Sequence, residues 1–297
     1  MKGDFMFNLR SRLCKKDNRE VSQKYVLFPN SENLPKIRLK ECIVEDILPH
    51  LLICPSMATI ESKEKAWVAT SMLARLLDTA TNSLVAIEND VPVGMIGGQE
   101  VIKEFAKDPS HSFFSDTAVQ NIMNRNLHIV SPNTKVDDLL KKMWHIQRDF
   151  ALVRNDDGNY STISARRLLE VGALCDTQMK VSDIPLKSIS TFNRDDTIGT
   201  IVTQMIENET ETLVLENTPQ FVNQQSLFER MVALNYLDGI DNFFELKSTA
   251  LNHKNGKIVS ENTTIPDMCK IMLGMKYSFV ITTKNVITPW DLIMGLR

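Results

Sequence analysis

The chain has 297 residues, a formal net charge of −3, 43% hydrophobic and 24% charged residues, which is ordinary for a globular protein with an apolar core. The slightly acidic balance excludes a global attraction to nucleic acid or anionic lipid. Five scattered cysteines without a CxxC pair favour reduced thiols over a disulfide framework or a zinc site. Since no apolar run approaches the ~20 residues of a membrane span, we predict a cytoplasmic protein.

Residues 1–36 form an N-terminal arm that differs in composition from the rest of the chain. Basic residues alternate there with apolar ones: Lys2, Arg10, Arg12, Lys15, Lys16 and Arg19 with Phe5, Phe7, Leu9 and Leu13. One interpretation is a solvated arm or a helix packed on the remaining chain. The other is a helix that binds a membrane surface or a partner.

Beyond the arm, four segments share one pattern: a short strand, a helix, two strands joined by a tight turn, and a second helix. The first segment is the least regular, and its residues between Thr59 and Met72 indicate a small insertion in the connecting turn. Its lead "LLICPSMAT" precedes a predicted helix at residues 65–77, strands at 83–88 and 93–97, and a helix at 98–106.

The other three segments follow the pattern closely, and the first helix of each has its apolar residues on one face. These faces are Val136, Leu139, Leu140 and Met143; Ile198, Ile201, Val202, Met205 and Ile206; and Ile265, Met268, Cys269 and Met272. The paired strands are predicted at 150–154 and 160–164, at 212–216 and 220–224, and at 277–282 and 285–288. The closing helices are predicted at 165–174, 226–232 and 289–296.

Each segment therefore predicts a small sheet with helices on one face, an α+β arrangement. A single unit of about 60 residues is marginally stable alone, so we expect the units to pair sheet to sheet. Four units imply two pairs, and "CDTQMKVSD" is the predicted joint. The predicted pairs are residues 37–176, with repeats at about 41–110 and 113–175, and residues 177–297, with repeats at about 178–237 and 240–297.

Short stretches related to V-x-D-I precede three of the repeats: "VEDIL" from Val44, "VQNIM" from Val119 and "VSDIP" from Val181. Together with "SPNT", "SENTT" and the final "VITPWDLI", they resemble the cystathionine-beta-synthase-type (CBS) domain, which occurs as tandem pairs called Bateman modules. The resemblance covers about Ile43 to Arg297. The layout is similar to that of four-repeat nucleotide sensors such as the gamma subunit of AMP-activated protein kinase.

The resemblance implies a site for an adenosine compound, such as AMP, ADP, ATP or S-adenosylmethionine. In the family, the Ser/Thr and Asp of a strand-to-helix [ST]xxD motif hold the ribose. That motif falls on Thr288 and Asp291 in the fourth repeat. The other repeats have Gly97 and Glu100, Ser164 and Arg167, and Asn223 and Ser226 at these places, so only the fourth matches fully.

A carboxylate suits vicinal hydroxyls, because its two oxygens accept two charge-assisted hydrogen bonds. The same residues have a second interpretation, since Gly97, Ser164, Asn223 and Thr288 are all favoured helix N-caps and Asp291 completes a capping box. Capping and ribose binding can coexist.

Phosphate groups require cations or free backbone N–H groups nearby. The resemblance implies that residues before the second strand meet them, and those residues are Asn82, Arg148, Glu211 and Lys276. Arg148 and Lys276 fit this role, whereas Glu211 would repel a phosphate. Thr264 and Ser278 are further ligand candidates, and Tyr277 could pack on a base.

The sequence contains no GxxxxGK[ST] or GxGxxG loop and no metal-ligand spacing among its histidines, so we predict no enzyme activity. The resemblance implies a non-catalytic sensor that transmits ligand occupancy to an unknown regulated protein. One alternative is an interaction scaffold with degenerate pockets. Another is nucleic-acid binding through the basic arm, which the acidic net charge disfavours. Whether the two pairs assemble within one chain or through a homodimer is left open.

Overall fold

The structure is a computed structural model that describes residues 42–44, 57–77, 82–155, 158–233 and 240–297. These residues belong to one compact unit, Ile37–Arg297. The predicted arm, residues 1–36, lies outside the described residues. Among the described residues, no helix combines the length and apolar composition that a bilayer crossing requires.

The first repeat is a three-stranded sheet in which β1 is parallel to β2, and β2 is antiparallel to β3. Its elements are β1 (Thr59–Glu61), α2 (Ala66–Leu76), β2 (Ser83–Glu88), β3 (Val91–Gly97) and α3 (Gly98–Lys107), followed by α4 (His111–Asp116) and α5 (Val119–Ile122). The predicted insertion after Thr59 is wrong. The strand begins there, and α2 follows a turn at residues 62–65, similar in length to the turn at 131–135 of the second repeat.

The second repeat has the same topology and matches the predicted elements most closely. It consists of β4 (Ile129–Val130), α6 (Val136–His145), β5 (Phe150–Arg154), β6 (Tyr160–Ser164) and α7 (Ala165–Gly172). Gly158 lies in the turn between β5 and β6 with a φ of 82°, a conformation that glycine adopts without steric cost.

The third repeat contains β7 (Thr191–Phe192), α8 (Ile198–Glu207), β8 (Thr212–Leu215), β9 (Gln220–Asn223) and α9 (Gln224–Ala233). The fourth contains β11 (Lys257–Ile258), α10 (Ile265–Leu273), β12 (Val280–Ile281), β13 (Val286–Ile287) and α11 (Pro289–Gly295). Short 3-10 helices lie before these repeats at Val181–Asp183, Ile240–Glu245 and Ser248–Ala250. The sequence prediction missed β10 (Lys254–Asn255), which joins the sheet of the third repeat beside β9.

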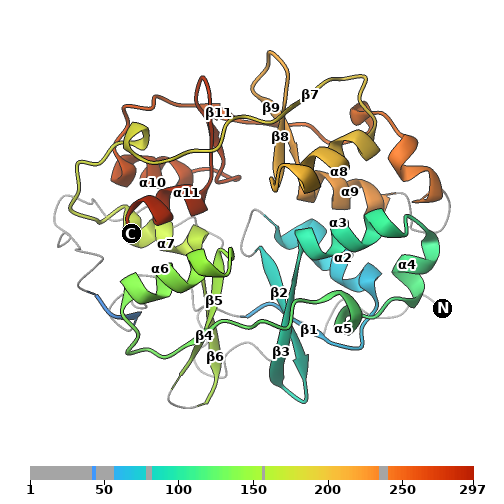
Figure 1. The fold of residues 1–297 in the computed structure, drawn as a ribbon, viewed down its shortest axis with the longest axis horizontal. Helices are drawn as coiled ribbons and strands as arrows, with labels where there is room; N and C mark the ends of the chain where they lie inside the picture. Colours follow the sequence, from blue (N-terminus) through green and yellow to red (C-terminus); the bar gives the residue numbers. More distant parts are fainter. Residues whose placement is uncertain (1–41, 45–56, 78–81, 156–157, 234–239) are drawn as a thin grey trace, which may run out of the picture. The chain divides into compact units, whose positions relative to one another are not determined.

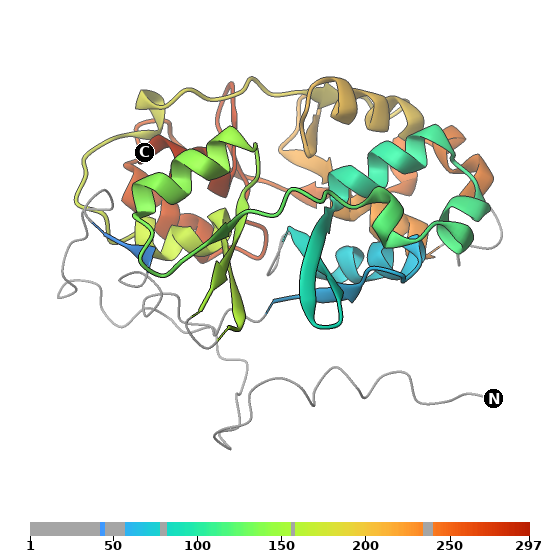
Figure 2. The same cartoon turned by 60° about the horizontal axis from the view of Figure 1, so that its bottom comes forward.

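The sheets of consecutive repeats pack face to face, as the sequence predicted. Val85 and Met95 of the first repeat share an apolar cluster with Phe150 and Leu152 of the second. In the same way, Val214 and Phe221 of the third repeat pack with Phe279 and Ile281 of the fourth. The two hairpins of the first pair lie side by side in Figures 1 and 2.

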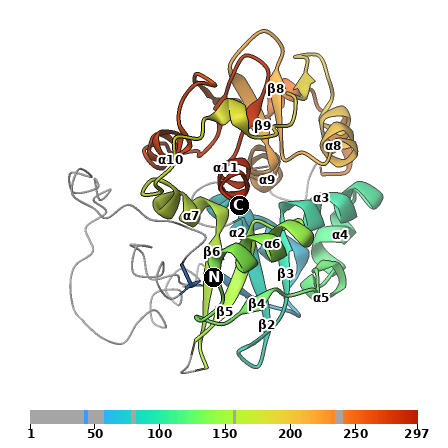
Figure 3. The same cartoon turned by 60° about the vertical axis from the view of Figure 1, so that its left-hand side comes forward.

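The helices bring the two pairs together within one chain. One apolar core joins the helices of the first and third repeats, including α2 against α9. A second core joins the second and fourth repeats, where α7 packs against α10 and α11 (Figure 3). The apolar helix faces predicted from the sequence supply these cores. Each repeat therefore contacts one neighbour through its sheet and another through its helices.

The segments before the repeats are exchanged within each pair. Val44, which precedes the first repeat, donates its N–H to Thr134 O and is buried in the second. Val119 packs on the first repeat, although it precedes the second. Val181 packs in the same core as the fourth repeat, and its N–H bonds Thr263 O. This crossing over ties the two members of each pair together.

Candidate ligand-binding cavity

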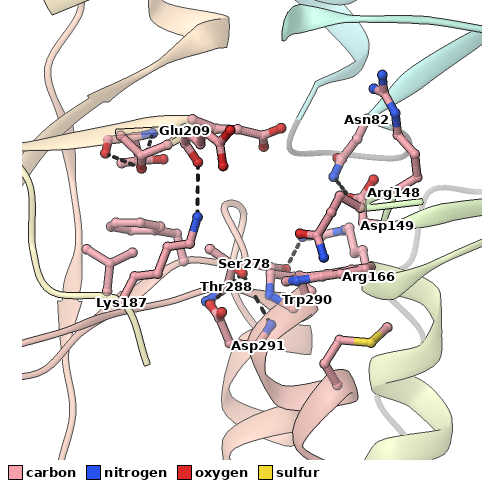
Figure 4. A pocket seen from close by; sticks show the side chains of 18 of the residues that line it. Asn82, Arg148, Asp149, Arg166, Lys187, Glu209, Ser278, Thr288, Trp290 and Asp291 are labelled. Atoms are coloured by element: carbon pink, nitrogen blue, oxygen red, sulfur yellow. Dashed lines mark hydrogen bonds between the residues drawn. The ribbon is translucent and has the colours of Figure 1, made fainter. Parts of the chain in front are cut away.

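A cavity of about 520 Å³ lies where the four repeats meet. Each repeat contributes the start of its second strand or the N-terminus of its second helix. Representative lining residues are Asn82 and Glu100; Arg148 and Arg166; Glu211 and Asn223; and Ser278, Thr288 and Asp291. Lys187, in the segment that leads into the third repeat, also lines it. Figure 4 labels several of these side chains, among them Asn82, Arg148, Lys187 and Asp291.

The second helix of every repeat begins with the predicted capping residue. Ser164 Oγ accepts from Arg167 N at 3.3 Å, and Asn223 Oδ1 accepts from Ser226 N at 3.1 Å. Thr288 Oγ1 accepts from Asp291 N at 3.4 Å. Gly97 is the N-cap of α3. The capping interpretation is therefore confirmed. The four capped helix N-termini lie toward one region.

Asp291 lies in the first turn of α11, with its carboxylate held on one side. Oδ2 accepts the N–H of Thr288 at 2.8 Å and the hydroxyl of Thr288 at 2.7 Å. Among the described residues no hydrogen bond reaches Oδ1, which leaves it as an acceptor for a ligand. Burial raises the pKa of Asp291 above the usual aspartate value, against the opposing effect of the Thr288 bonds and the Lys187 charge.

In the first repeat, Glu100 occupies the place that Asp291 has in the fourth. Its Oε2 accepts Gly97 N at 2.9 Å, and its Oε1 forms an ion pair with Arg148 of the second repeat. A second bridge runs the other way, because Asn82 donates to the carboxylate of Asp149. Burial raises the pKa of Asp149. Both acidic groups on this side of the cavity are thus engaged by the neighbouring repeat, and Figure 4 shows the bond between Asn82 and Asp149.

In the third repeat, the motif residues are engaged by a lysine of the chain itself. Lys254 on β10 is 4% exposed, and its ammonium donates to Asn223 Oδ1 at 3.0 Å and to Gln225. The ammonium also lies 4.5 Å from the centre of the Tyr277 ring. Ser226 Oγ donates to Asn223 Oδ1 at 3.2 Å and to Asn252 O at 3.0 Å. No carboxylate stands at this motif.

Two cations lie close to the fourth-repeat motif. Arg166, at the start of α7, donates to the hydroxyl of Ser278, and Lys187 donates to Glu209 O at 3.2 Å. An aromatic pair adjoins them: Trp144 and Trp290 are stacked with ring centres 6.1 Å apart and planes within 6°. No local pattern in the sequence indicates Arg166, Lys187 or the tryptophans, because their proximity depends on contacts between repeats.

Of the predicted ligand residues, Thr288, Asp291, Ser278, Glu100 and Arg148 line the cavity. Thr264, Lys276 and Tyr277 are not among its lining residues. Thr264 caps α10. Lys276 is exposed, with its ammonium 5.0 Å from the Tyr277 ring centre.

The strand registers also correct the alignment of the repeats before the second strand. Gly97 pairs with Ser83, Ser164 with Phe150 and Asn223 with Thr212. The preceding residues Asn82, Asp149 and Glu211 are therefore equivalent, and continuing the register from Val280–Ile287 adds Ser278. Arg148 stands one position before Asp149, and Lys276 stands two positions before Ser278. The turns after the first helices differ in length.

The described lining residues include six carboxyl groups and four cationic side chains. The carboxyls are Glu100, Asp149, Asp183, Glu209, Glu211 and Asp291, and the cations are Arg148, Arg166, Lys187 and Arg297. Burial raises the pKa of two of these carboxyls, Asp149 and Asp291. The cavity therefore has cations near Asp291, the candidate acceptor for ribose hydroxyls. Its lining as a whole has no large net charge.

Comparison with known proteins agrees with this architecture. Residues 119–173 match the family model of the CBS domain. No curated protein sequence matches the chain. The structure is similar to the crystal structure of MJ1225 from Methanocaldococcus jannaschii, described as a candidate archaeal homolog of g-AMPK, with 12% identity, a TM-score of 0.69, and 83% of this chain and 98% of that chain covered.

An uncharacterized conserved protein from Pyrococcus horikoshii is similar as well, with 10% identity, a TM-score of 0.50, and 82% of this chain and 96% of that chain covered. Matches over a smaller part of the chain include the CBS domain pair of protein MJ0100, solved with 5-methylthioadenosine and S-adenosyl-L-methionine. The identity is 19% and the TM-score 0.34, and the match covers 43% of this chain and 92% of that chain. Residues 119–173 therefore form a CBS domain, and the four repeats have the fold of two tandem CBS pairs of the Bateman type.

Proposed function

We propose that this chain is a non-catalytic regulatory sensor that binds an adenine nucleotide or adenosyl ligand, chiefly in the fourth repeat. Thr288 and Asp291 hold the ribose, and Ser278 lies beside them in the cavity wall. Residues 37–176 and 177–297 are the two regulatory modules. The protein acts in the cytoplasm and passes ligand occupancy to a regulated protein.

The observation that carries this proposal is the position of the Asp291 carboxylate. It stands in the wall of a cavity of about 520 Å³, and small-molecule sites generally span about 300–1,000 Å³. Its Oδ2 is fixed by Thr288 while Oδ1 accepts no bond from the described residues. A vicinal diol can therefore bond to a carboxylate that is already oriented.

The surroundings of α11 offer a route for transmitting occupancy. The helix packs against α7 of the second repeat, so a ligand at its N-terminus touches the contact between the two modules. A ligand shifts such an equilibrium only by its different affinity for two arrangements, typically about 1–3 kcal/mol.

The direct test is thermal unfolding with AMP, ADP, ATP and S-adenosylmethionine, each measured separately. Ligand at 100 times its Kd should stabilise the folded protein by about 2.7 kcal/mol. At least one compound should raise the melting temperature. Absence of any shift, together with no heat of binding in calorimetry, would refute the proposed function.

Binding should weaken in acid for a reason specific to this site. The ionised carboxylate of Asp291 is the acceptor, and burial raises its pKa. Affinity should therefore begin to fall at a higher pH than it would for an exposed aspartate.

A second candidate, an interaction scaffold without ligand, is favoured by the third repeat. Lys254 and Ser226 already engage Asn223 there, and Glu100 in the first repeat is paired with Arg148. If all pockets were closed in this way, the repeats would serve as a docking surface. The same titrations decide between the two candidates.

A further inference from the structure

The ion pair between Glu100 and Arg148 blocks the first-repeat motif in a way that the fourth repeat does not share. Both residues line the cavity, and their side chains are 10% and 20% exposed. Oε1 of Glu100 is bound to Arg148 and Oε2 to Gly97 N at 2.9 Å, so both oxygens are engaged. At Asp291, only Oδ2 is engaged by the described residues.

A neutral nucleoside cannot open this pair without breaking the direct ion pair of Arg148. Its diol could bond to Glu100 after Arg148 has moved away, but the partly buried guanidinium would then keep only the nearby carboxyl of Asp149, which is buried and already bonded by Asn82. Removing one partner of a desolvated ion pair is strongly unfavourable. The first repeat should therefore discriminate against adenosine.

A nucleotide can replace both partners of the pair. Its ribose hydroxyls can donate to Glu100, and its phosphate can accept from the guanidinium of Arg148, whose planar donors match phosphate oxygens. Asp149 opposes the phosphate from the neighbouring position, but Asn82 donates to its carboxyl and its pKa is raised by burial. Opening the pair thus exchanges one set of charge-assisted bonds for another.

We propose that the Glu100–Arg148 ion pair closes a second nucleotide site in the first repeat, which opens only for a ligand with both a vicinal diol and an anionic phosphate. This inference rests on the proposed function and adds which ligands each of the two sites accepts. The fourth repeat then accepts adenosine and its nucleotides, whereas the first accepts nucleotides alone.

Calorimetric titration of the full chain with AMP and with adenosine tests this without any substitution. Two AMP molecules should bind per chain, against one adenosine. One equivalent of each would overturn the inference and leave the proposed function intact. Binding of neither compound would overturn both.

Variants isolate the first-repeat site. Asp291→Asn disables the fourth repeat, so AMP should bind this variant with one equivalent and adenosine at least tenfold more weakly. In that background, Glu100→Gln should abolish AMP binding, and Arg148→Met should reduce the preference for AMP to less than threefold. Lys141→Met, which removes an exposed ion pair with Asp137 on α6, is the matched control and should change neither.

Equal affinities of AMP and adenosine for Asp291→Asn would overturn the inference. So would the loss of all binding in a folded Asp291→Asn protein whose parent binds AMP. Circular dichroism and melting curves establish that each variant is folded.

Discussion

Two helices of the fourth repeat begin with the same Thr-x-x-Asp sequence, and the structure gives them different environments. In α10, Thr264 Oγ1 donates to Asp267 Oδ2 at 2.9 Å and accepts Asp267 N at 3.4 Å. In α11, the corresponding distances between Thr288 and Asp291 are 2.7 and 3.4 Å. The two motifs share these two bonds, and in α11 Asp291 Oδ2 also accepts Thr288 N at 2.8 Å, which completes a capping box.

They differ in what surrounds the carboxylate. The Asp267 side chain is 59% exposed, and its Oδ1 accepts the ammonium of Lys270 at 3.1 Å. Asp291 lines the cavity, with Oδ1 unoccupied by the described residues. The pKa of Asp267 is lowered, first by its bond with Thr264 and then by Lys270, whereas burial raises that of Asp291. A capping sequence therefore indicates a ligand site only where the fold encloses its carboxylate.

The largest expected difference between the two motifs concerns ligand affinity. Asp291→Ala should weaken binding of AMP, or of the compound that gives the largest thermal shift, by roughly ten- to a hundredfold. The reason is the loss of about 1.5–3 kcal/mol of hydrogen bonding. Asp267→Ala removes the same residue type from an equivalent cap and should leave the affinity unchanged. Titration calorimetry measures both, and equal losses would show that the cavity is not the site.

Removal of the capping hydroxyl should affect stability at both helices, with the larger loss at α11. Loss of a Thr cap generally costs about 0.5–2 kcal/mol. We expect Thr288→Ala near the upper end of that range, because the hydroxyl also bonds a partly buried carboxylate, and Thr264→Ala near the lower end. Thr→Ser at each position keeps the hydroxyl and should recover most of the loss in urea unfolding. A larger loss at Thr264 would contradict this ranking.

The smallest expected effect is a difference of opposite sign in the pH dependence of stability. The folded protein favours protonated Asp291, so the wild type loses stability as pH rises through its raised pKa. Asp291→Asn should therefore be more stable than the wild type at neutral pH, with the difference vanishing as pH falls through that pKa toward the unfolded value, about 3.9.

Asp267→Asn should behave in the reverse way. The lowered pKa of Asp267 stabilises the folded state above the unfolded value, and this contribution is lost as pH falls through the lowered pKa. The variant should be less stable than the wild type at neutral pH by under ~1 kcal/mol, since the carboxylate is exposed. Melting temperatures of both variants from pH 3 to 7.5 test the signs, and parallel curves would contradict them.

Much of the fold could be predicted because each repeat is specified by local pattern. The apolar face of α6, with Val136, Leu139 and Met143, recurs in α8 and α10, and all of these residues are buried. β5 and β6 have the predicted bounds. The misses include β10, α4, the start of α9 at Gln224 and the supposed insertion after Thr59. Each is a short stretch whose conformation depends on neighbouring strands or helices.

The candidate site was less predictable. The sequence placed Thr288 and Asp291 together, since they are three residues apart at a helix start. It gave no indication that Arg148 pairs with Glu100 or that Lys254 engages Asn223. Those contacts join residues 48 and 31 positions apart in the chain, and they depend on how the repeats pack.

Local sequence pattern specifies the four repeats, their apolar faces and the capping residues, because periodicity and capping act over a few neighbouring positions. Whether a motif carboxylate is exposed, paired with a cation or enclosed in a cavity depends on how the repeats assemble, because burial and ion pairing depend on distances between side chains of different repeats. The same Thr-x-x-Asp pattern at Thr264 and at Thr288 therefore acquires different electrostatics when the repeats assemble.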